Sequence, residues 1–284
     1  MENNLTASSG IRIGVLISGS GTNMDAIIAA CETSRINGRV VFAGSDNPDA
    51  TGLEKAASKK ISTFVVDYAD IIRDFPSAID GPWNDPDPTA RLKDRLPLDF
   101  DLEAIRGQQR FFPPDADRGK VNRFLCTRAA AEAALLNEMA AHPFDLLVLA
   151  GFMRNLTPYF IDRVNTEPGR PRIMNIHPAL LPAFPGVDGY GDTFRYGCRI
   201  GGCTVHYIDY GEDSGPIIGQ RAFPITDDDT IDTVRKKGLA LEWELYPECI
   251  QLFAQGRLHV IKMTHTLDSG AIYQRNIVKI ARIQ

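Results

Sequence analysis

The sequence predicts an α/β protein with a Rossmann-like fold: an open, mostly parallel sheet with helices on both faces. Two observations lead to this prediction. Short apolar runs rich in β-branched residues alternate with helical segments along most of the chain. The 284 residues are 44% hydrophobic, which is enough to bury the core of one large domain. We expect this domain to cover residues 11–263, between a flexible tail at 1–10 and a C-terminal extension at 264–284.

The first part of the chain predicts three strands and two helices in alternation. The run IRIGVLISG at residues 11–19 ends in glycine and is typical of a buried strand. A helix is expected at 22–32, because apolar residues recur there at helical spacing. The next expected elements are a strand at 39–46, a helix at 51–60 and a strand at 61–68. This order favours a parallel sheet.

Residues 70–120 interrupt the alternation. They are dense in proline and charge, and a loop of this length is unusual inside a compact domain. We interpret them as an insertion that lies over the surface with one or two short helices. The insertion is either a solvated decoration or a functional segment, such as a lid or an oligomer contact.

The pattern of strands and helices resumes after the insertion. An alanine-rich helix is expected at 122–142, before a buried strand at 144–152. A long helix at 228–256 begins at an aspartate or threonine cap and ends at Gly256. No strong pattern is visible from residue 264 onward. The remaining expected elements are a short helix at 158–164, a strand at 171–182, two strands at 201–209 and 215–225 joined by a tight acidic loop, and a last strand at 257–263.

The composition argues against several classes of protein. The net charge of −5 and the pI near 5.6, without a basic stripe, make a nucleic-acid partner unexpected. No apolar run approaches the ~20 residues that span a membrane, and the first residues lack the pattern of a secretion signal. The five cysteines form no CxxC pair and no histidine spacing of a metal site, which fits reduced thiols and no bound metal. We therefore expect a cytoplasmic protein.

The loop SGSGTNM, residues 18–24, joins the first expected strand to the first helix. Glycine lets the backbone approach a ligand, and a helix start offers free N–H groups to an anion. One interpretation is a dinucleotide site built on Gly19, Gly21 and Asp46, although the third glycine of that pattern is missing. A tight turn without a ligand is a further alternative. The other interpretation is a phosphomonoester cradle formed by Gly21, Thr22 and Asn23.

The stretch MNIHPALLP, residues 174–182, places two polar side chains at the end of a strand. Residues two apart on a strand face the same way, so Asn175 and His177 point together. Pro178 ends the strand, and the carboxyl ends of strands line the ligand crevice of an open parallel sheet. An amide can stabilise an oxyanion, and an imidazole can transfer a proton near neutral pH. The alternative is a capped strand end whose histidine is fully hydrogen-bonded.

A third group is expected beside His177, because a carboxylate would orient the ring and stabilise its charged form. The candidate is Asp213 in YGEDSGPI, in the loop between two expected strands. Asp209 and Glu212 lie in the same loop, and sequence spacing does not choose among the three acids. His206, inside an expected strand, fits a core or pocket-wall position better than a catalytic role.

Several motifs together resemble one protein family. They lie within residues 11–66 and 122–262 and are VLISGSGTN, SDNPDATGLEKA, LLVLAGFMRNLTP, NIHPALLPAFPG, GGCTVHYIDYGEDSGPIIGQ and ELYP. The chain resembles the folate-dependent formyltransferases, and most closely the branch that acts on glycinamide ribonucleotide. The resemblance implies transfer of the formyl group of 10-formyltetrahydrofolate, a co-substrate, to the amine of glycinamide ribonucleotide in purine biosynthesis. It implies small-molecule partners, no metal, and a homodimer as one option for assembly.

The resemblance also implies roles for individual residues. The catalytic set would stabilise the tetrahedral oxyanion formed by direct attack of the amine, and it comprises Asn175, His177 and Asp213. The residues that hold the ribonucleotide would be Gly21, Thr22, Asn23 and Glu242. The residues that bind the folate would be Met153, Arg154, Asn155, Leu156, Asn175, Asp209 and Asp213.

Two residues, the inserted segment and the unfamiliar tail after the last expected strand depart from the family pattern. Asn155 stands where an aliphatic residue is usual, which predicts a more polar folate pocket. Trp243 stands where a histidine is common, next to the expected ribonucleotide end. The insertion replaces a shorter segment that includes a basic residue for the folate tail, a role open to Arg118 or Lys120.

Four other functions compete with this interpretation. A formyltetrahydrofolate hydrolase would use the same three residues with water, and an amino-sugar-nucleotide formyltransferase would use them on another amine. The loop at 18–24 argues against both, because it suits a phosphorylated acceptor. An NAD-binding oxidoreductase would leave Asn175, His177 and Asp213 unexplained. The intact set of three residues disfavours a non-catalytic ligand binder.

Overall fold

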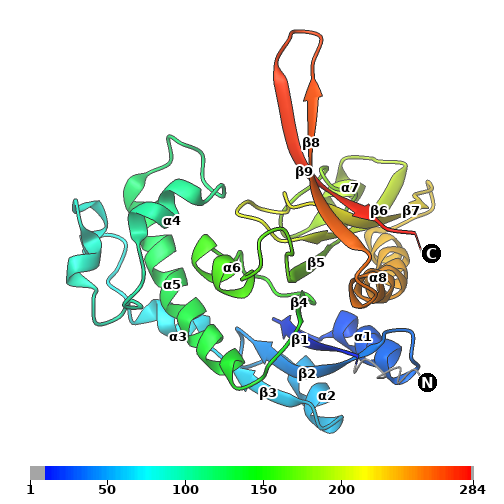
Figure 1. Ribbon diagram of the computed structural model, residues 1–284, viewed down its shortest axis with the longest axis horizontal. Helices are drawn as coiled ribbons and strands as arrows, with labels where there is room; N and C mark the ends of the chain where they lie inside the picture. The colour runs from blue at the N-terminus through cyan, green and yellow to red at the C-terminus, as the bar shows by residue number, and fades with distance from the viewer. Residues whose placement is uncertain (1–9, 283–284) are drawn as a thin grey trace, which may run out of the picture.

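The computed structural model describes residues 10–282, so residues 1–9 of the expected tail lie outside the described part. Within this range a seven-stranded sheet forms the centre of the molecule, in the order β3-β2-β1-β4-β5-β6-β7 (Figure 1). Its strands are β1 (Ile11–Ile17), β2 (Gly38–Ser45), β3 (Ser62–Val65), β4 (Leu146–Leu149), β5 (Ile173–His177), β6 (Ile200–Tyr207) and β7 (Ile217–Pro224).

The sheet is parallel from β3 to β5 and antiparallel from β5 to β7. Its central strands read as continuous apolar runs because helices cover both of their faces. The two strands expected around the acidic loop form the antiparallel pair β6–β7. The prediction of an open, mostly parallel α/β sheet with helices on both faces is confirmed.

Successive residues of β1 face opposite sides of the sheet. Ile13 and Val15 pack with α1 and α8 on one face, whereas Leu16 packs with α5 and α6 on the other. Burial of these side chains is the main source of stability for the fold. The helices of the first face are α1 (Thr22–Glu32), α2 (Gly52–Ser58) and α8 (Ile231–Ala254), and those of the second are α3 (Tyr68–Arg73), α5 (Arg118–Ala140) and α6 (Pro158–Val164).

Both long helices begin at side-chain caps. Before α8, the Thr230 hydroxyl accepts from the Thr233 amide and the Thr233 hydroxyl accepts from the Thr230 amide, which is a capping box. Before α5, Asp117 accepts a hydrogen bond of 2.7 Å from the Lys120 amide. Helix α5 therefore begins at Arg118, ahead of the alanine-rich run that predicted it.

The inserted segment packs against α5 and has a buried cluster of its own (Figure 1). Trp83 is 2% exposed, stacks on Phe75 and donates from Nε1 to the Ser77 carbonyl at 2.8 Å. The cluster continues onto α5 through Leu125. The segment is therefore more than a solvated decoration. Besides α3, its helices are η1 (Pro82–Asn84), η2 (Pro88–Arg91) and α4 (Leu102–Gln108).

The end of the described chain forms a hairpin that projects from the body of the molecule (Figure 1). Its strands are β8 (Leu258–Thr266) and β9 (Ile272–Ile280), so the segment from residue 264 onward has more order than its sequence indicated. Most of its side chains are exposed, and the alternation of burial that marks a strand is therefore weak. The sequence also gave no sign of the short helix α7 (Gly189–Arg195).

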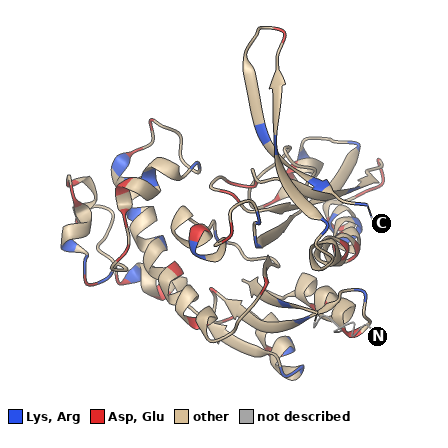
Figure 2. Ribbon diagram, viewed as in Figure 1, with Lys and Arg blue, Asp and Glu red and all other residues tan. Residues whose placement is uncertain are grey.

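Charged residues of both signs are mixed over the described molecule (Figure 2). Among the described residues, no helix combines the length and apolar character needed to cross a membrane.

Candidate active site

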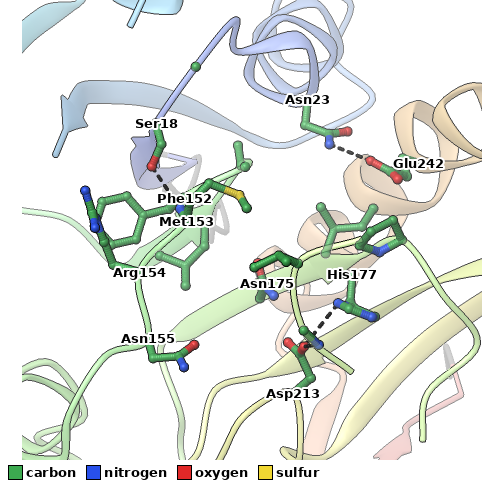
Figure 3. Close-up of a pocket in the computed structure, with 18 of the residues that line it drawn as sticks. Ser18, Asn23, Phe152, Met153, Arg154, Asn155, Asn175, His177, Asp213 and Glu242 are labelled. Carbon is green, nitrogen blue, oxygen red and sulfur yellow. Dashed lines mark hydrogen bonds and ion pairs between the residues drawn. The ribbon is translucent and has the colours of Figure 1, made fainter. Parts of the chain in front are cut away.

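A cleft of about 590 Å³ opens at the carboxyl ends of β1, β4 and β5, where an open parallel sheet binds ligands. All twelve residues of the catalytic, ribonucleotide and folate sets that the resemblance implies line this one cleft. Figure 3 labels eight of them: Asn23, Met153, Arg154, Asn155, Asn175, His177, Asp213 and Glu242. The geometry shows that they lie together, and their individual roles stay predictions. The twelve residues are Gly21, Thr22, Asn23, Met153, Arg154, Asn155, Leu156, Asn175, His177, Asp209, Asp213 and Glu242.

Strand β5 delivers an amide and an imidazole to the same wall of the cleft. Asn175 and His177 are two residues apart on the strand, so their side chains leave the same face of the sheet. His177 is 3% exposed, while Asn175 is half-buried. Figure 3 shows the two side chains next to each other, with Asp213 beside His177.

Both ring nitrogens of His177 face oxygen atoms. Nδ1 lies 3.2 Å from Oδ2 of Asp213, and Nε2 lies 2.7 Å from the carbonyl oxygen of Phe184. A carboxylate and a carbonyl are acceptors only, so a ring with a proton on each nitrogen can donate to both. The two acceptors therefore hold the His177 ring in one fixed orientation.

Of the three acids in this loop, Asp213 is the one whose carboxylate lies 3.2 Å from Nδ1 of His177. The Gly186 amide donates to Asp213 Oδ2 at 2.9 Å, and the backbone of Asp213 is in the left-handed region at φ 47°. Such a conformation is strained for a non-glycine residue. Asp209 instead accepts from Ser214 Oγ at 2.6 Å, and Glu212 faces the loop after β4.

His206 belongs to the same network, although its place inside a strand predicted only a core or wall position. Its Nε2 lies 3.3 Å from Nδ2 of Asn175 and 3.6 Å from Oδ1 of Asp213. Burial lowers the pKa of His206, and the Asp213 carboxylate only partly opposes this shift. A neutral ring that donates from Nδ1 to the Tyr207 carbonyl can accept from Asn175, which fixes the direction of that amide.

The loop between β1 and α1 forms one end of the cleft. Gly21 is the N-cap of α1 and has a φ of 68°, a conformation that favours glycine. A side chain there would also lie 3.2 Å from the Cα of Gly52. The first turn of a helix has N–H groups without partners in the helix, and Thr22 and Asn23 occupy this turn. This end of the cleft suits an anion.

Glu242 of α8 lies opposite this loop. Its two oxygens accept hydrogen bonds of 2.6 Å, one from Nδ2 of Asn23 and one from the hydroxyl of Tyr190. Burial raises the pKa of Glu242, and these two hydrogen bonds oppose the shift. Among the described residues, the buried Oδ1 of Asn23 has no hydrogen-bond partner. The sequence gave no signal for Tyr190, which reaches the site from the unexpected helix α7.

Asp46, the acid that a dinucleotide site would need, is already engaged. It is 2% exposed, accepts from the Ser18 hydroxyl and forms an ion pair with Arg154. It is absent from the described residues that line the cleft. These contacts leave the dinucleotide interpretation without its ribose-binding group.

The loop after β4 forms the opposite end of the cleft. Met153 is 56% exposed and Leu156 is buried, so this end offers apolar surface. Asn155 donates to Glu212 at 3.3 Å, which adds a polar contact where an aliphatic residue is usual. The described residues that line the cleft do not include Arg118 or Lys120.

No metal centre is evident in residues 10–282, where no group of three or more His, Cys, Asp or Glu side chains is arranged as metal ligands. An amide, an imidazole and a carboxylate converge at the cleft, and the helix start nearby suits an anion. Fold and site together define an α/β enzyme that transfers a carbonyl-type group to a nucleophile.

Comparison with known families agrees with this class. The formyl transferase family matches residues 11–250, and the chain belongs to this family.

Relatives of known name extend the comparison. The chain is 30% identical over 258 residues to the phosphoribosylglycinamide formyltransferase of Escherichia coli, covering 91% of this chain and 94% of the relative. It is 29% identical over 247 residues to the trifunctional purine biosynthetic protein adenosine-3 of Chironomus tentans, covering 86% of this chain but only 14% of that protein. The crystal structure of glycinamide ribonucleotide transformylase 1 from Symbiobacterium toebii matches with a TM-score of 0.68 and 34% identity, over 99% of both chains.

Proposed function

We propose that this chain transfers the formyl group of 10-formyltetrahydrofolate to the amine of glycinamide ribonucleotide, a step of purine biosynthesis. The observation that carries the proposal is the contact of 3.2 Å between His177 and Asp213, in a cleft that also contains Asn175 and the start of α1. The names of the similar proteins support the choice of donor and acceptor.

The proposed reaction is a direct transfer between the two substrates. The amine nitrogen attacks the formyl carbon, a C–N bond forms, and the carbonyl oxygen becomes an oxyanion. Collapse of this intermediate breaks the bond between the formyl carbon and N10 of the folate. One proton leaves the attacking amine and one reaches N10, so the charges balance. Holding both substrates in one cleft supplies much of the rate.

Asn175 and His177 are placed to stabilise the oxyanion. The second proton of the Asn175 amide is free of the contact with His206 and can donate into the cleft. An oxyanion is a stronger acceptor than the Phe184 carbonyl, and it would replace that carbonyl at Nε2 of His177. Asp213 holds the ring from its other nitrogen and can pass the amine proton onward through water.

The acceptor would lie toward the start of α1. Its phosphate would receive hydrogen bonds from the backbone of Gly21, Thr22 and Asn23, while Glu242 would accept from ribose hydroxyls. The folate would lie between the loop after β4 and the loop 209–213. All five cysteines, which lie in the described part of the chain, are free thiols, and this supports a cytoplasmic setting.

The test is to mix the purified protein with 10-formyltetrahydrofolate, with and without glycinamide ribonucleotide, and to measure loss of the formyl group. We expect loss only when the amine is present. Loss without the amine would contradict the proposal and indicate a hydrolase. No loss in either mixture would contradict the proposal and mean that the changes in the pocket have altered the acceptor or ended catalysis.

A further inference from the structure

The inserted segment contributes a side chain to the active-site cleft. Phe111, which follows α4, is half-buried and lines the cleft together with the residues that the resemblance assigned. None of the sequence motifs that indicated the function includes this residue. The insertion thus reaches the site from outside the sheet. Hydrogen bonds and aromatic packing hold Phe111 in this position.

Two sets of hydrogen bonds fix the turn that carries Phe111. The side-chain oxygen of Gln109 accepts from the amides of Phe111 and Phe112, at 2.9 and 3.0 Å. The amide of Arg110 donates to the Tyr210 carbonyl at 2.8 Å. Tyr210 belongs to the loop that continues to Asp213, so the turn is joined directly to the catalytic loop.

Aromatic packing supports the ring from behind. Phe124 of α5 lies edge-to-face with Phe111 at 6.2 Å and with Phe112 at 5.2 Å between ring centroids. Phe112 and Phe124 are partly buried and pack against the buried cluster of the insertion. One side of the Phe111 ring is therefore held, while the rest of the ring is available to the cleft.

Phe111 is the more accessible aromatic side chain when it is compared with the other aromatic residues that line the cleft. Phe152 and Tyr190 also line the cleft, but they are at most 8% exposed. Phe152 is already in edge contact with Tyr68. The exposed Met153 offers a flexible apolar contact rather than a flat one.

We propose that Phe111 is a specificity-determining residue for the formyl donor, and that its ring packs against the planar aromatic part of the folate. This inference rests on the function proposed above. Packing between two aromatic rings prefers an offset or edge geometry and strengthens binding beyond the effect of area alone. The insertion then forms one wall of the donor-binding site, and the donor binds between Phe111 and the loop after β4.

The experiment separates binding from turnover. Binding of folic acid, a planar and unreactive probe, is measured by calorimetry, and KM is measured for each substrate. In Phe111→Ala we expect folic acid to bind roughly three- to tenfold more weakly, with a matching rise in the KM for the donor. The KM for glycinamide ribonucleotide and kcat should stay within about twofold of wild type. Phe111→Tyr, which keeps the ring, should restore the affinity.

Phe100→Ala is the matched control for loss of packing in the insertion. Phe100 lies edge-to-face with Tyr159 in the same buried cluster and is not one of the described residues that line the cleft. We expect this variant to lower the melting temperature without changing the affinity for folic acid. Equal weakening in Phe100→Ala and Phe111→Ala would overturn the proposal, since a general loosening would then explain both.

Two further outcomes distinguish this inference from the proposed function. If wild type binds folic acid and transfers the formyl group, but Phe111→Ala binds equally well, only the inference is wrong. If wild type neither binds folic acid nor consumes the formyl donor, the proposed function is wrong and the inference is overturned with it.

Discussion

Asp213 has a strained backbone, and its carboxylate lies against the ring of His177. The first prediction concerns the loss of this carboxylate. Asp213→Asn keeps the shape of the side chain but removes the negative charge beside Nδ1. We expect turnover to fall by roughly 10²–10⁴-fold, the usual contribution of a proton-transfer group, while the melting temperature changes little. Steady-state kinetics and thermal unfolding measure the two effects.

The matched control for this variant is Asp115→Asn, which changes an exposed aspartate outside the cleft in the same way. It should leave turnover unaltered. Near-normal turnover in Asp213→Asn would contradict the assignment of this residue. A large fall in both variants would indicate that lost charge in general, rather than the contact with His177, is responsible.

Glu132 is a buried acid behind the site and predicts a dependence of stability on pH. It is fully buried on α5 and accepts from the amide and hydroxyl of Thr157 at 2.7 and 2.5 Å. Burial raises its pKa from 4.5 to about 7, against the opposing effect of these hydrogen bonds and of Arg128. Between these two values the unfolded chain has lost the proton and the folded chain retains it.

Rising pH therefore favours unfolding in this window. The stabilisation from protonated Glu132 is complete below about pH 4.5 and is lost as the pH approaches 7, and the difference is about 3 kcal/mol. In Glu132→Gln the free energy of unfolding should vary less between pH 5 and 7 than in wild type. Urea unfolding at both pH values measures it. The exposed Glu138→Gln on the same helix should keep the wild-type slope, and an unchanged slope in Glu132→Gln would contradict the prediction.

The insertion, at the scale of an element, should depend on Trp83 for its order. Trp83→Ala removes a fully packed indole and the hydrogen bond to Ser77. Replacement of a buried aromatic side chain by alanine costs about 3–5 kcal/mol, so we expect a loss of this size or local unfolding of residues 75–105. Denaturant unfolding and hydrogen exchange distinguish these two forms of the loss.

The second tryptophan provides the control. Trp243 is 41% exposed on α8, and Trp243→Ala should change stability by only about 0.5 kcal/mol. If Trp83→Ala were as mild as this control, the insertion would have no cooperative core of its own.

The elements that sequence predicted well are those whose burial follows a simple period. Strand β1 and helix α8 show continuous apolar runs or helical spacing, and both formed close to the expected bounds. Helix α7 was missed because two of its seven residues are glycine, and its start depends on the Asp188 cap. Most of β8 lies in the strand expected at 257–263, but β9 was missed because exposure on both faces removes the alternation by which a strand is recognised.

Residue spacing alone predicted the candidate site only where chemistry coincides with a local pattern, and the family resemblance supplied the other residues. The two-residue spacing of Asn175 and His177 predicts their shared direction from sequence alone. The pairing of Asp213 with His177, and the approach of His206 and Phe111, depend on how distant segments pack. Such contacts are set by tertiary structure, and residue spacing contains no record of them.

The whole molecule consists of a packed body and a projecting hairpin, which should differ in stability (Figure 1). At its base, Val260 and Val278 pack on the core, and Arg257 and Ala281 exchange hydrogen bonds of 2.7 and 2.9 Å. Toward its tip the hairpin has only two strands, an arrangement that is marginally stable in water. We expect amide exchange to be slow at the base and fast near residues 264–272. Equally slow amide exchange along the whole hairpin would contradict this gradient and indicate that another molecule covers the tip of the hairpin.

The place of the insertion in the chain has a consequence for chain entropy and folding speed. Val15 of β1 lies beside Val148 of β4, although the inserted segment separates them in sequence. Closing a longer loop costs little, since each doubling of its length adds only ~0.6 kcal/mol. The sheet can therefore accept the extra segment between adjacent strands at small thermodynamic expense. The larger effect is kinetic, because pairing between strands so distant in the chain raises the contact order and slows folding.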